Sequence, residues 1–202
     1  MLCLAMIDCI IPAAGTSSRM RSWKLFLPFK DKPVIDHILE AALLAADRII
    51  IVSGFKSDAL EEHIENLGLN KDRYILTCNP KYYRGMFSSI QEGVKHSQSS
   101  LFFIMLADLP LVQANTYAQL LTYHNSCDEP FEIIQPMYKN TPGHPVLLSG
   151  TTRKVIETLP PTASMREVFS RCRIKRLPWD DPSIIWDIDT PEAYKTMLRS
   201  TT

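Results

Sequence analysis

The chain alternates short, uniformly apolar runs with longer stretches in which apolar residues recur every three or four positions. The apolar runs predict buried strands over 7–12, 48–53, 74–78, 101–107, 132–138, 145–148 and 184–188. The periodic stretches predict helices over 33–46, 58–66, 87–96, 113–125, 152–158, 165–171 and 191–200. Asp58 and Glu61 have capping-box spacing, and Thr190 precedes a proline as a helix cap does.

Alternation of strands and helices predicts an α/β fold of three α/β/α layers, with a mostly parallel, mixed and twisted sheet covered by helices on both faces. In such sheets ligands bind beyond the carboxyl ends of the strands. The 202 residues, at 23.0 kDa, fit one domain spanning 1–202, with a core over about 6–200. No repeat or linker divides them.

Composition excludes several classes of protein. A hydrophobic content of 46% is enough to fill a core, so overall disorder is excluded. Lys and Arg (22) balance Asp and Glu (22), which argues against nucleic acid as a partner, and the apolar runs are too short to span a membrane. The five cysteines form no C-x-x-C pair, and the apolar start lacks the basic flank of a signal peptide, so we expect a reducing, cytoplasmic location.

A loop of small residues follows the first predicted strand. It reads Pro12-Ala13-Ala14-Gly15-Thr16-Ser17, with Arg19 and Lys24 close behind. Small residues let the backbone approach a ligand, successive amides can point at phosphate oxygens, and the two cations would neutralise a polyphosphate. The segment is neither a Walker A loop nor G-x-G-x-x-G, so on pattern alone a polar surface loop with two solvated cations remains the alternative.

Four further motifs stand at predicted strand ends or in turns. Asn79-Pro80 leads to Gly85 and to Ser88-Ser89, which would also suit an ordinary helix start. Asp108 follows the most apolar predicted strand, as a Mg²⁺ ligand or a local cap would. The other two motifs are Gly143-His144-Pro145, which also suits a tight turn, and Asp187-Ile188-Asp189, whose acids would share one face of a strand.

In this order and spacing the motifs resemble the nucleotidyltransferases of the molybdopterin type, above all the molybdenum cofactor cytidylyltransferases. The family pattern A-A-G-x-S-x-R-M-G-x-x-K is matched from Ala13 to Lys24, except that Arg21 replaces a glycine. The patterns G-M-x-x-S, D-M-P, G-H-P-V and D-I-D-T-P-E-D have counterparts at 85–89, 108–110, 143–146 and 187–192. Thr141 and Pro142 stand where cytidylyltransferases carry arginine or glycine, a departure on the acceptor side. The resemblance covers about 7–194.

The resemblance implies a Rossmann-like nucleotidyltransferase fold and a Mg²⁺-dependent transfer of a nucleotidyl group, with release of pyrophosphate. The implied catalytic residues are Arg19, Lys24 and Asp108, and the implied Mg²⁺ ligands are Asp108 and Asp189, with Asp187 as the rival of Asp189. The implied nucleotide-binding residues are Pro12, Ala13, Ala14, Gly15, Thr16, Ser17, Lys24, Asn79, Gly85, Ser88 and Ser89, and the acceptor-binding residues are Gly143, His144 and Pro145.

By the same analogy, Ala13-Ala14-Gly15 indicates CTP as the nucleotide. The implied acceptor is molybdopterin or another phosphorylated compound, and a molybdoenzyme or its maturation chaperone would be a further partner. Two alternatives stay open. One is a nucleotidyltransferase acting on a sugar phosphate or an aminoalcohol phosphate. The other is a non-catalytic nucleotide- or cofactor-binding protein with Arg21 as a sign of lost turnover, although the presence of both acids and Lys24 argues against it.

Overall fold

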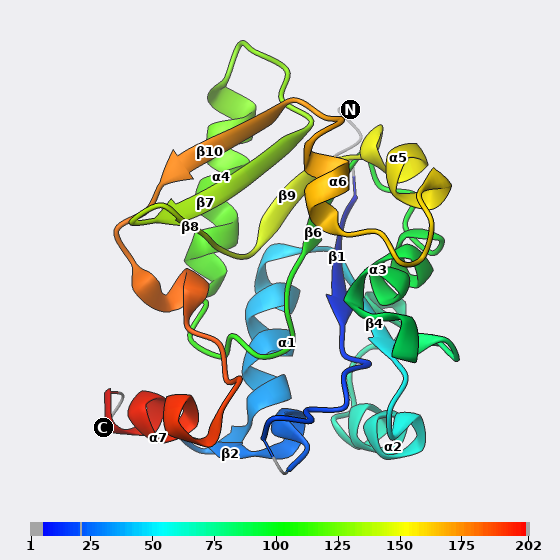
Figure 1. Cartoon of the computed structure of the whole chain (residues 1–202), viewed down its shortest axis with the longest axis vertical. Helices are drawn as coiled ribbons and strands as arrows, with labels where there is room; N and C mark the ends of the chain where they lie inside the picture. Colours follow the sequence, from blue (N-terminus) through cyan, green and yellow to red (C-terminus); the bar gives the residue numbers. More distant parts are fainter. Residues whose placement is uncertain (1–5, 21, 201–202) are drawn as a thin grey trace.

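The strands form one mixed, eight-stranded sheet in the order β10-β7-β9-β6-β1-β4-β5, with β8 paired to β7 (Figure 1). The computed structural model describes residues 6–20 and 22–200, so Arg21 lies outside the described residues. The strands of the sheet are β1 (Ile7–Pro12), β4 (Arg48–Ser53), β5 (Tyr74–Cys78), β6 (Leu101–Ile104), β7 (Ile133–Tyr138), β8 (Thr141–Pro142), β9 (Val146–Ser149) and β10 (Ile174–Pro178). β1 is parallel to β4 and β6, whereas β9 is antiparallel to β6 and β7. A separate hairpin pairs β2 (Pro28–Phe29) with β3 (Lys32–Pro33).

Helices cover both faces of the sheet. They are α1 (Val34–Ala45), α2 (Ser57–Asn66), α3 (Met86–Val94), α4 (Ala114–Ser126), α5 (Thr152–Thr158), α6 (Met165–Phe169) and α7 (Pro191–Ser200), with short 3-10 turns η1 (Lys24–Phe26), η2 (Lys71–Arg73), η3 (Tyr82–Arg84) and η4 (Pro182–Ile185). Cys9 and Ile11 of β1 pack in a core with α1, α2 and α4, and Ile10 packs in a second core with α3, α5 and α6. This alternation confirms the predicted three layers.

Two predicted strands differ from the structure at the sheet's carboxyl edge. The strand expected over 184–188 is wrong, because Pro182–Ile185 is a 3-10 turn. Asp181 caps this turn, and its carboxylate accepts a hydrogen bond from the amide of Ser183 at 2.9 Å. The strand expected over 101–107 ends at Ile104, where its pairing with β9 ends, although Met105 and Ala107 remain buried.

Sequence reasoning also missed one strand and misplaced one helix cap. One edge of the sheet is formed by β10, which was missed because Lys175 and Arg176 interrupt its apolar run. The capping box at Asp58 and Glu61 is wrong, since α2 begins one residue earlier, at Ser57, and no side chain caps it. The cap at Thr190 is confirmed: its Oγ1 accepts the amide of Ala193 at 3.1 Å.

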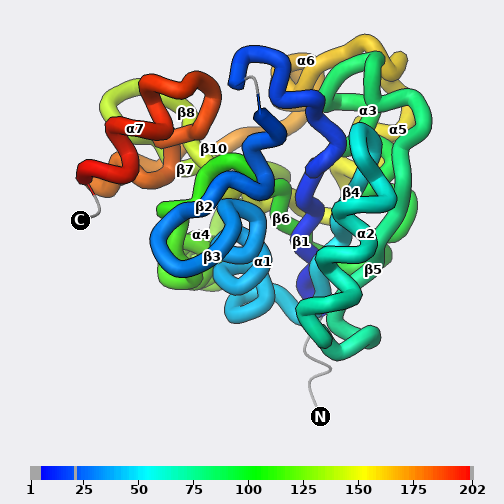
Figure 2. Tube along the Cα trace, turned by 90° about the horizontal axis from the view of Figure 1, so that it is seen from below, coloured from blue at the N-terminus to red at the C-terminus, as the bar shows by residue number. Residues whose placement is uncertain are grey.

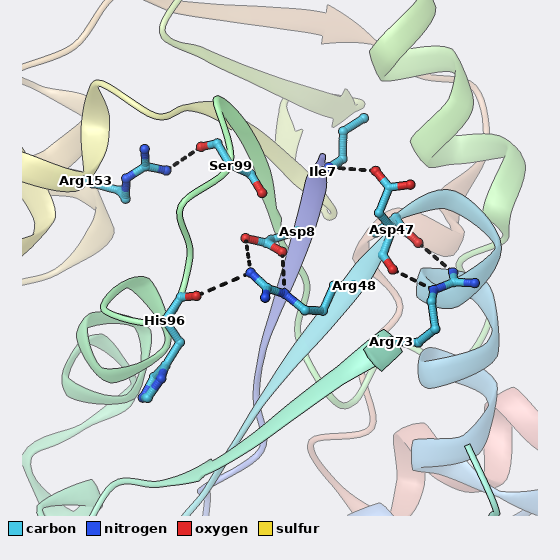
Figure 3. A network of polar contacts seen from close by, with 9 residues as sticks. Ile7, Asp8, Asp47, Arg48, Arg73, His96, Ser99 and Arg153 are labelled. Atoms are coloured by element: carbon cyan, nitrogen blue, oxygen red, sulfur yellow. Dashed lines mark hydrogen bonds and ion pairs between the residues drawn. The ribbon is translucent and has the colours of Figure 1, made fainter. Parts of the chain in front are cut away.

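A polar network closes the amino-terminal end of the central strands (Figure 3). The fully buried Asp8 accepts two hydrogen bonds from Arg48, at 3.0 and 3.3 Å, and Arg48 also donates to the carbonyl of His96 at 3.5 Å. Beside it, Arg73 donates to carbonyl oxygens at the end of α1. The carboxyl end of the central strands, opposite this network, therefore remains for a ligand. At that end the segment after β1 lies between α7 and α3 when the molecule is viewed from below (Figure 2).

No helix among the described residues has the length and apolarity needed to cross a membrane.

Candidate active site

A cavity of about 370 Å³ lies at the carboxyl ends of β1 and β6. It is lined by Pro12, Ala13, Ala14, Gly15, Thr16, Ser17, Lys24, Leu25, Tyr82, Tyr83, Gly85, Met86, Ser89, Leu106, Ala107 and Asp108. The structure thus brings the whole of the first loop, 12–17, together with four other predicted positions, Lys24, Gly85, Ser89 and Asp108. The cavity lies beyond the carboxyl ends of the strands, where α/β sheets bind their ligands.

The first loop is a compact turn with unpaired amides. Ser17 adopts a left-handed conformation (φ 52°), its carbonyl accepts the amide of Met20 at 2.9 Å, and its Oγ accepts the amide of Lys24 at 3.1 Å. Within the described part of the chain, the amides of residues 15–17 donate to no protein acceptor. Consecutive free amides at the rim of a cavity suit the oxygens of a phosphate group.

Four predicted charged side chains form a chain of ion pairs beside this loop. Lys24 Nζ donates to Asp108 Oδ2 and, at 3.0 Å, to Asp189 Oδ1. The second oxygen of Asp189 lies 2.8 Å from Arg19 Nη2. Burial lowers the pKa of Lys24, but attraction by Asp108 and Asp189 outweighs it, so the net pKa is raised and Lys24 is an ammonium.

A backbone hydrogen bond places Asp189 in this cluster without a strand. The amide of Ile188 donates to the carbonyl of Asp108 at 3.0 Å, which joins the segment before α7 to the loop that follows β6. Because 186–190 are not a strand, the strand alternation expected to give Asp187 and Asp189 a common face is absent. Asp189 contacts Lys24 and Arg19, whereas Asp187 lines a separate cavity of about 270 Å³ against α7.

Asp187 makes no ion pair with any of the residues that the structure describes. Partial burial raises the pKa of its carboxyl, the charges of Asp189 and Asp108 raise it further, and Lys24 and Arg19 oppose the rise. This carboxylate is therefore close to the cluster but is not part of its hydrogen bonding.

Asp108 and Asp189 fit a divalent cation such as Mg²⁺. Carboxylate oxygens are the donors that hard cations prefer, and Mg²⁺ is commonly held by one or two carboxylates together with substrate phosphates. Asp108 Oδ1 is buried and has no hydrogen-bond partner among the described residues, so it retains a free ligand position. Across the same residues, no group of three or more His, Cys, Asp or Glu side chains is placed to hold a metal.

Asn79 and Ser88, both predicted to bind nucleotide, lie behind the cavity wall. Asn79 Nδ2 donates to Ser88 Oγ at 2.9 Å and to Ser89 Oγ at 3.0 Å, and its Oδ1 accepts the amide of Lys81 at 2.9 Å. Ser88 Oγ donates to the carbonyl of Gly85 at 2.7 Å. These bonds shape the turn that presents Gly85 and Ser89 to the cavity.

The predicted acceptor motif packs beside the cluster but does not line the first cavity. A Cβ on Gly143 would lie 2.5 Å from Ile184 Cδ1, and the amide of His144 donates to the carbonyl of Ile184 at 2.9 Å. His144 Nδ1 lies 3.4 Å from the carbonyl of Ile104, and the peptide bond to Pro145 is cis. Burial lowers the pKa of His144 despite its bond to Ile104, so its imidazole is neutral near pH 7.

Sequence reasoning missed the wall formed by η3 and the start of α3. Tyr82, Tyr83 and Met86 line the cavity, and Tyr83 and Met86 are 73% and 54% exposed. Gly54 allows this wall to approach the first loop, since a Cβ there would lie 2.7 Å from Ala14 Cβ and 2.8 Å from Tyr82 Cβ. A glycine directly after the apolar run 48–53 was the available signal for this close approach.

Comparison with known proteins shows which family the chain resembles over its length. Residues 9–177 match the family model of the MobA-like NTP transferase domain. The chain is 30% identical over 193 residues to the molybdenum cofactor cytidylyltransferase of Escherichia coli (strain K12), covering 96% of each. The crystal structure of Rv0371c from Mycobacterium tuberculosis H37Rv has the same fold, with a TM-score of 0.79 at 22% identity, covering 96% of this chain and 98% of that chain.

The same mycobacterial protein has also been solved in complex with manganese, with a TM-score of 0.73 at 21% identity, covering 96% of this chain and 99% of that chain. At such identity the two solved structures establish the shared fold, and the family model with the Escherichia coli relative establishes the kinship. The chain belongs to the MobA-like NTP transferase family.

Proposed function

We propose that this protein transfers CMP from CTP to a phosphorylated acceptor of the molybdopterin type, in a reaction that depends on Mg²⁺ and releases pyrophosphate. The observation that carries the proposal is the cluster of Lys24, Asp108 and Asp189 beside a cavity rimmed by the free amides of the first loop. The likeness over nearly the whole chain to a molybdenum cofactor cytidylyltransferase supports the choice of nucleotide and acceptor.

In the reaction, a phosphate oxygen of the acceptor attacks the α-phosphorus of CTP, and the bond to the pyrophosphate oxygen breaks. The amides of 15–17 donate to phosphate oxygens, while Arg19 and Lys24 neutralise the β- and γ-phosphates. Asp108 and Asp189 would hold Mg²⁺, which when bound would supply further neutralisation of the phosphates. Positioning and charge neutralisation suffice for such a transfer, so no covalent nucleophile is required.

We ascribe the selectivity for CTP to the cavity wall that contains Ala14 and Tyr82. Both side chains pack close to Gly54, where a Cβ would lie 2.7 Å from Ala14 Cβ and 2.8 Å from Tyr82 Cβ, and a wall held this close would favour a pyrimidine over the larger purine. Discrimination by such shape differences amounts to about 1–3 kcal/mol, or roughly 10- to 200-fold.

The test is pyrophosphate release by the purified protein with each of the four nucleoside triphosphates and Mg²⁺, with and without a molybdopterin-type acceptor. We expect release with CTP and the acceptor, and much less with GTP. Faster release with GTP would overturn the base assignment, and release only with a sugar phosphate or an aminoalcohol phosphate would overturn the acceptor. No release from a folded protein with any pair would overturn the catalytic proposal.

Lys24→Ala tests the phosphate site. The variant should bind CTP at least about tenfold more weakly, while its affinity for CMP should change little, because the proposed contacts of the lysine are with the β- and γ-phosphates. Lys71→Ala, on η2, is the matched control and should bind both nucleotides as the parent does. Equal affinities of Lys24→Ala and the parent for CTP, measured by calorimetry, would show that Lys24 does not contact the triphosphate.

A further inference from the structure

The ammonium of Lys24 lies between the two carboxylates that suit a divalent cation. Its Nζ donates to one oxygen of Asp108 and one of Asp189, and only 17% of the side chain is exposed. Two carboxylates without a cation would repel each other, and here Lys24 and Arg19 balance their two negative charges within the protein.

We infer that Lys24 occupies the position of the divalent cation while the nucleotide site is empty, so that the metal binds together with the triphosphate and hardly at all before it. The inference rests on the proposed function only in assigning Asp108 and Asp189 to the metal. It adds an order of assembly, in which the nucleotide releases Lys24 from the carboxylates and opens the site to the cation.

In this proposal the ammonium of Lys24 has two positions, one between the two carboxylates and one against the oxygens of the triphosphate. Its backbone amide is tied to Ser17 Oγ at 3.1 Å, so the residue is anchored beside the phosphate loop, and it lines the same cavity as the free amides of 15–17. A metal ion entering alone would displace the ammonium from both carboxylates and then repel it at short range in a partly buried site. Triphosphate oxygens offer the displaced ammonium new partners and add negative charge that both cations then share.

Arg19 provides a control for the loss of one positive charge near the carboxylates. It also pairs with Asp189, but through the other oxygen, and its side chain is 70% exposed. Removing Arg19 takes one positive charge from the cluster without vacating the space between the carboxylates. If Lys24 acts by occupying that space, its removal should strengthen metal binding far more than the removal of Arg19.

The experiment measures Mn²⁺ binding to the full chain without nucleotide, by electron paramagnetic resonance of free Mn²⁺ and by calorimetry. We expect weak binding to the parent, binding tightened about tenfold or more in Lys24→Met, and a change of no more than about threefold in Arg19→Gln. Adding a non-hydrolysable CTP analogue should tighten Mn²⁺ binding to the parent. Asp108→Asn in the Lys24→Met background should remove the gain, which would locate the ion between the carboxylates.

The readout separates this inference from the proposed function, because Mn²⁺ binding without nucleotide involves no acceptor and no turnover. Circular dichroism checks that each variant is folded, and Lys24→Gln is the second variant if Lys24→Met is not. Equal Mn²⁺ affinities of the parent and the Lys24 variants, or an equal gain in Arg19→Gln, would overturn the occupancy of the cation position by Lys24. Tight Mn²⁺ binding to the nucleotide-free parent would overturn the order of assembly.

Discussion

Replacing Arg48 with methionine should destabilise the protein strongly and leave its active site unchanged. Arg48 opens β4 at the amino-terminal end of the sheet, on the side away from the cavity (Figure 3). Its guanidinium is the partner of Asp8, whose side chain has no exposed surface and accepts two hydrogen bonds from it, at 3.0 and 3.3 Å. In Arg48→Met the carboxylate of Asp8 stays buried and loses its partner.

The expected loss follows from that burial. Breaking a buried ion pair by removing one partner costs about 3–5 kcal/mol, because it leaves an uncompensated buried charge. For a chain of this length each kcal/mol lowers the Tm by about 2–4 °C, so the Tm should fall by roughly 6–20 °C. Arg48→Met combined with Asp8→Asn removes the stranded charge and should recover roughly half of the loss.

Urea and thermal unfolding followed by circular dichroism measure these differences, and nucleotide binding at 25 °C serves as the check on the active site. Lys95→Met is the matched control, since it breaks an exposed ion pair with Glu92 and should cost less than about 1 kcal/mol. A double variant no more stable than Arg48→Met would refute the reasoning, because the loss would then come from the packing of Arg48 or its bond to His96.

Two further predictions concern the carboxyl end of the sheet. Gly54→Ala places a Cβ within 2.8 Å of both Ala14 and Tyr82, so these two walls of the cavity must move apart. The affinity for CTP, measured by calorimetry, should fall several-fold. An unchanged affinity would show that CTP binding does not depend on the close approach at Gly54. Asp187→Asn should raise the Tm at neutral pH. Partial burial, with the nearby carboxylates, raises the pKa of Asp187 above its ordinary value of 3.8, so the folded state loses stability as pH rises from that value through the folded pKa. The gain in Tm should shrink as the pH is lowered to about 3, where Asp187 of the parent becomes protonated in both the folded and the unfolded state. Asp180→Asn is the control and should melt like the parent. A gain in Tm that is independent of pH would contradict this origin.

Much of the fold is readable from the sequence because burial imposes local patterns. The strand over Ile7–Pro12 has its predicted limits, since all its residues are apolar except Asp8 and it is covered on both faces. The helix over Pro191–Ser200 begins where Thr190 and a proline predict it. The first loop, Arg19, Lys24 and Asp108 also stand out, because small residues and isolated charges at strand ends mark the edge where α/β sheets bind ligands.

Patterns fail where a segment's neighbours, rather than its own residues, decide its structure. The apolar residues of 184–188 fit a strand, but β10 takes the free edge of β7, and a proline after the capping Asp181 favours a helical turn instead. β10 lies at the edge of the sheet and none of its five residues is fully buried, so charged side chains are tolerated there and its apolar signal is weak.

The active site itself depends on contacts between distant parts of the chain. Lys24 meets Asp108 and Asp189 across 84 and 165 residues of sequence, and Asp189 reaches the cluster through a backbone hydrogen bond from Ile188 to Asp108 that no side-chain pattern encodes. The sequence alone shows which residues can carry charge to the cavity. Their pairing is decided by the tertiary structure, because an ion pair forms only where packing brings the two groups within a few ångströms and removes them from water.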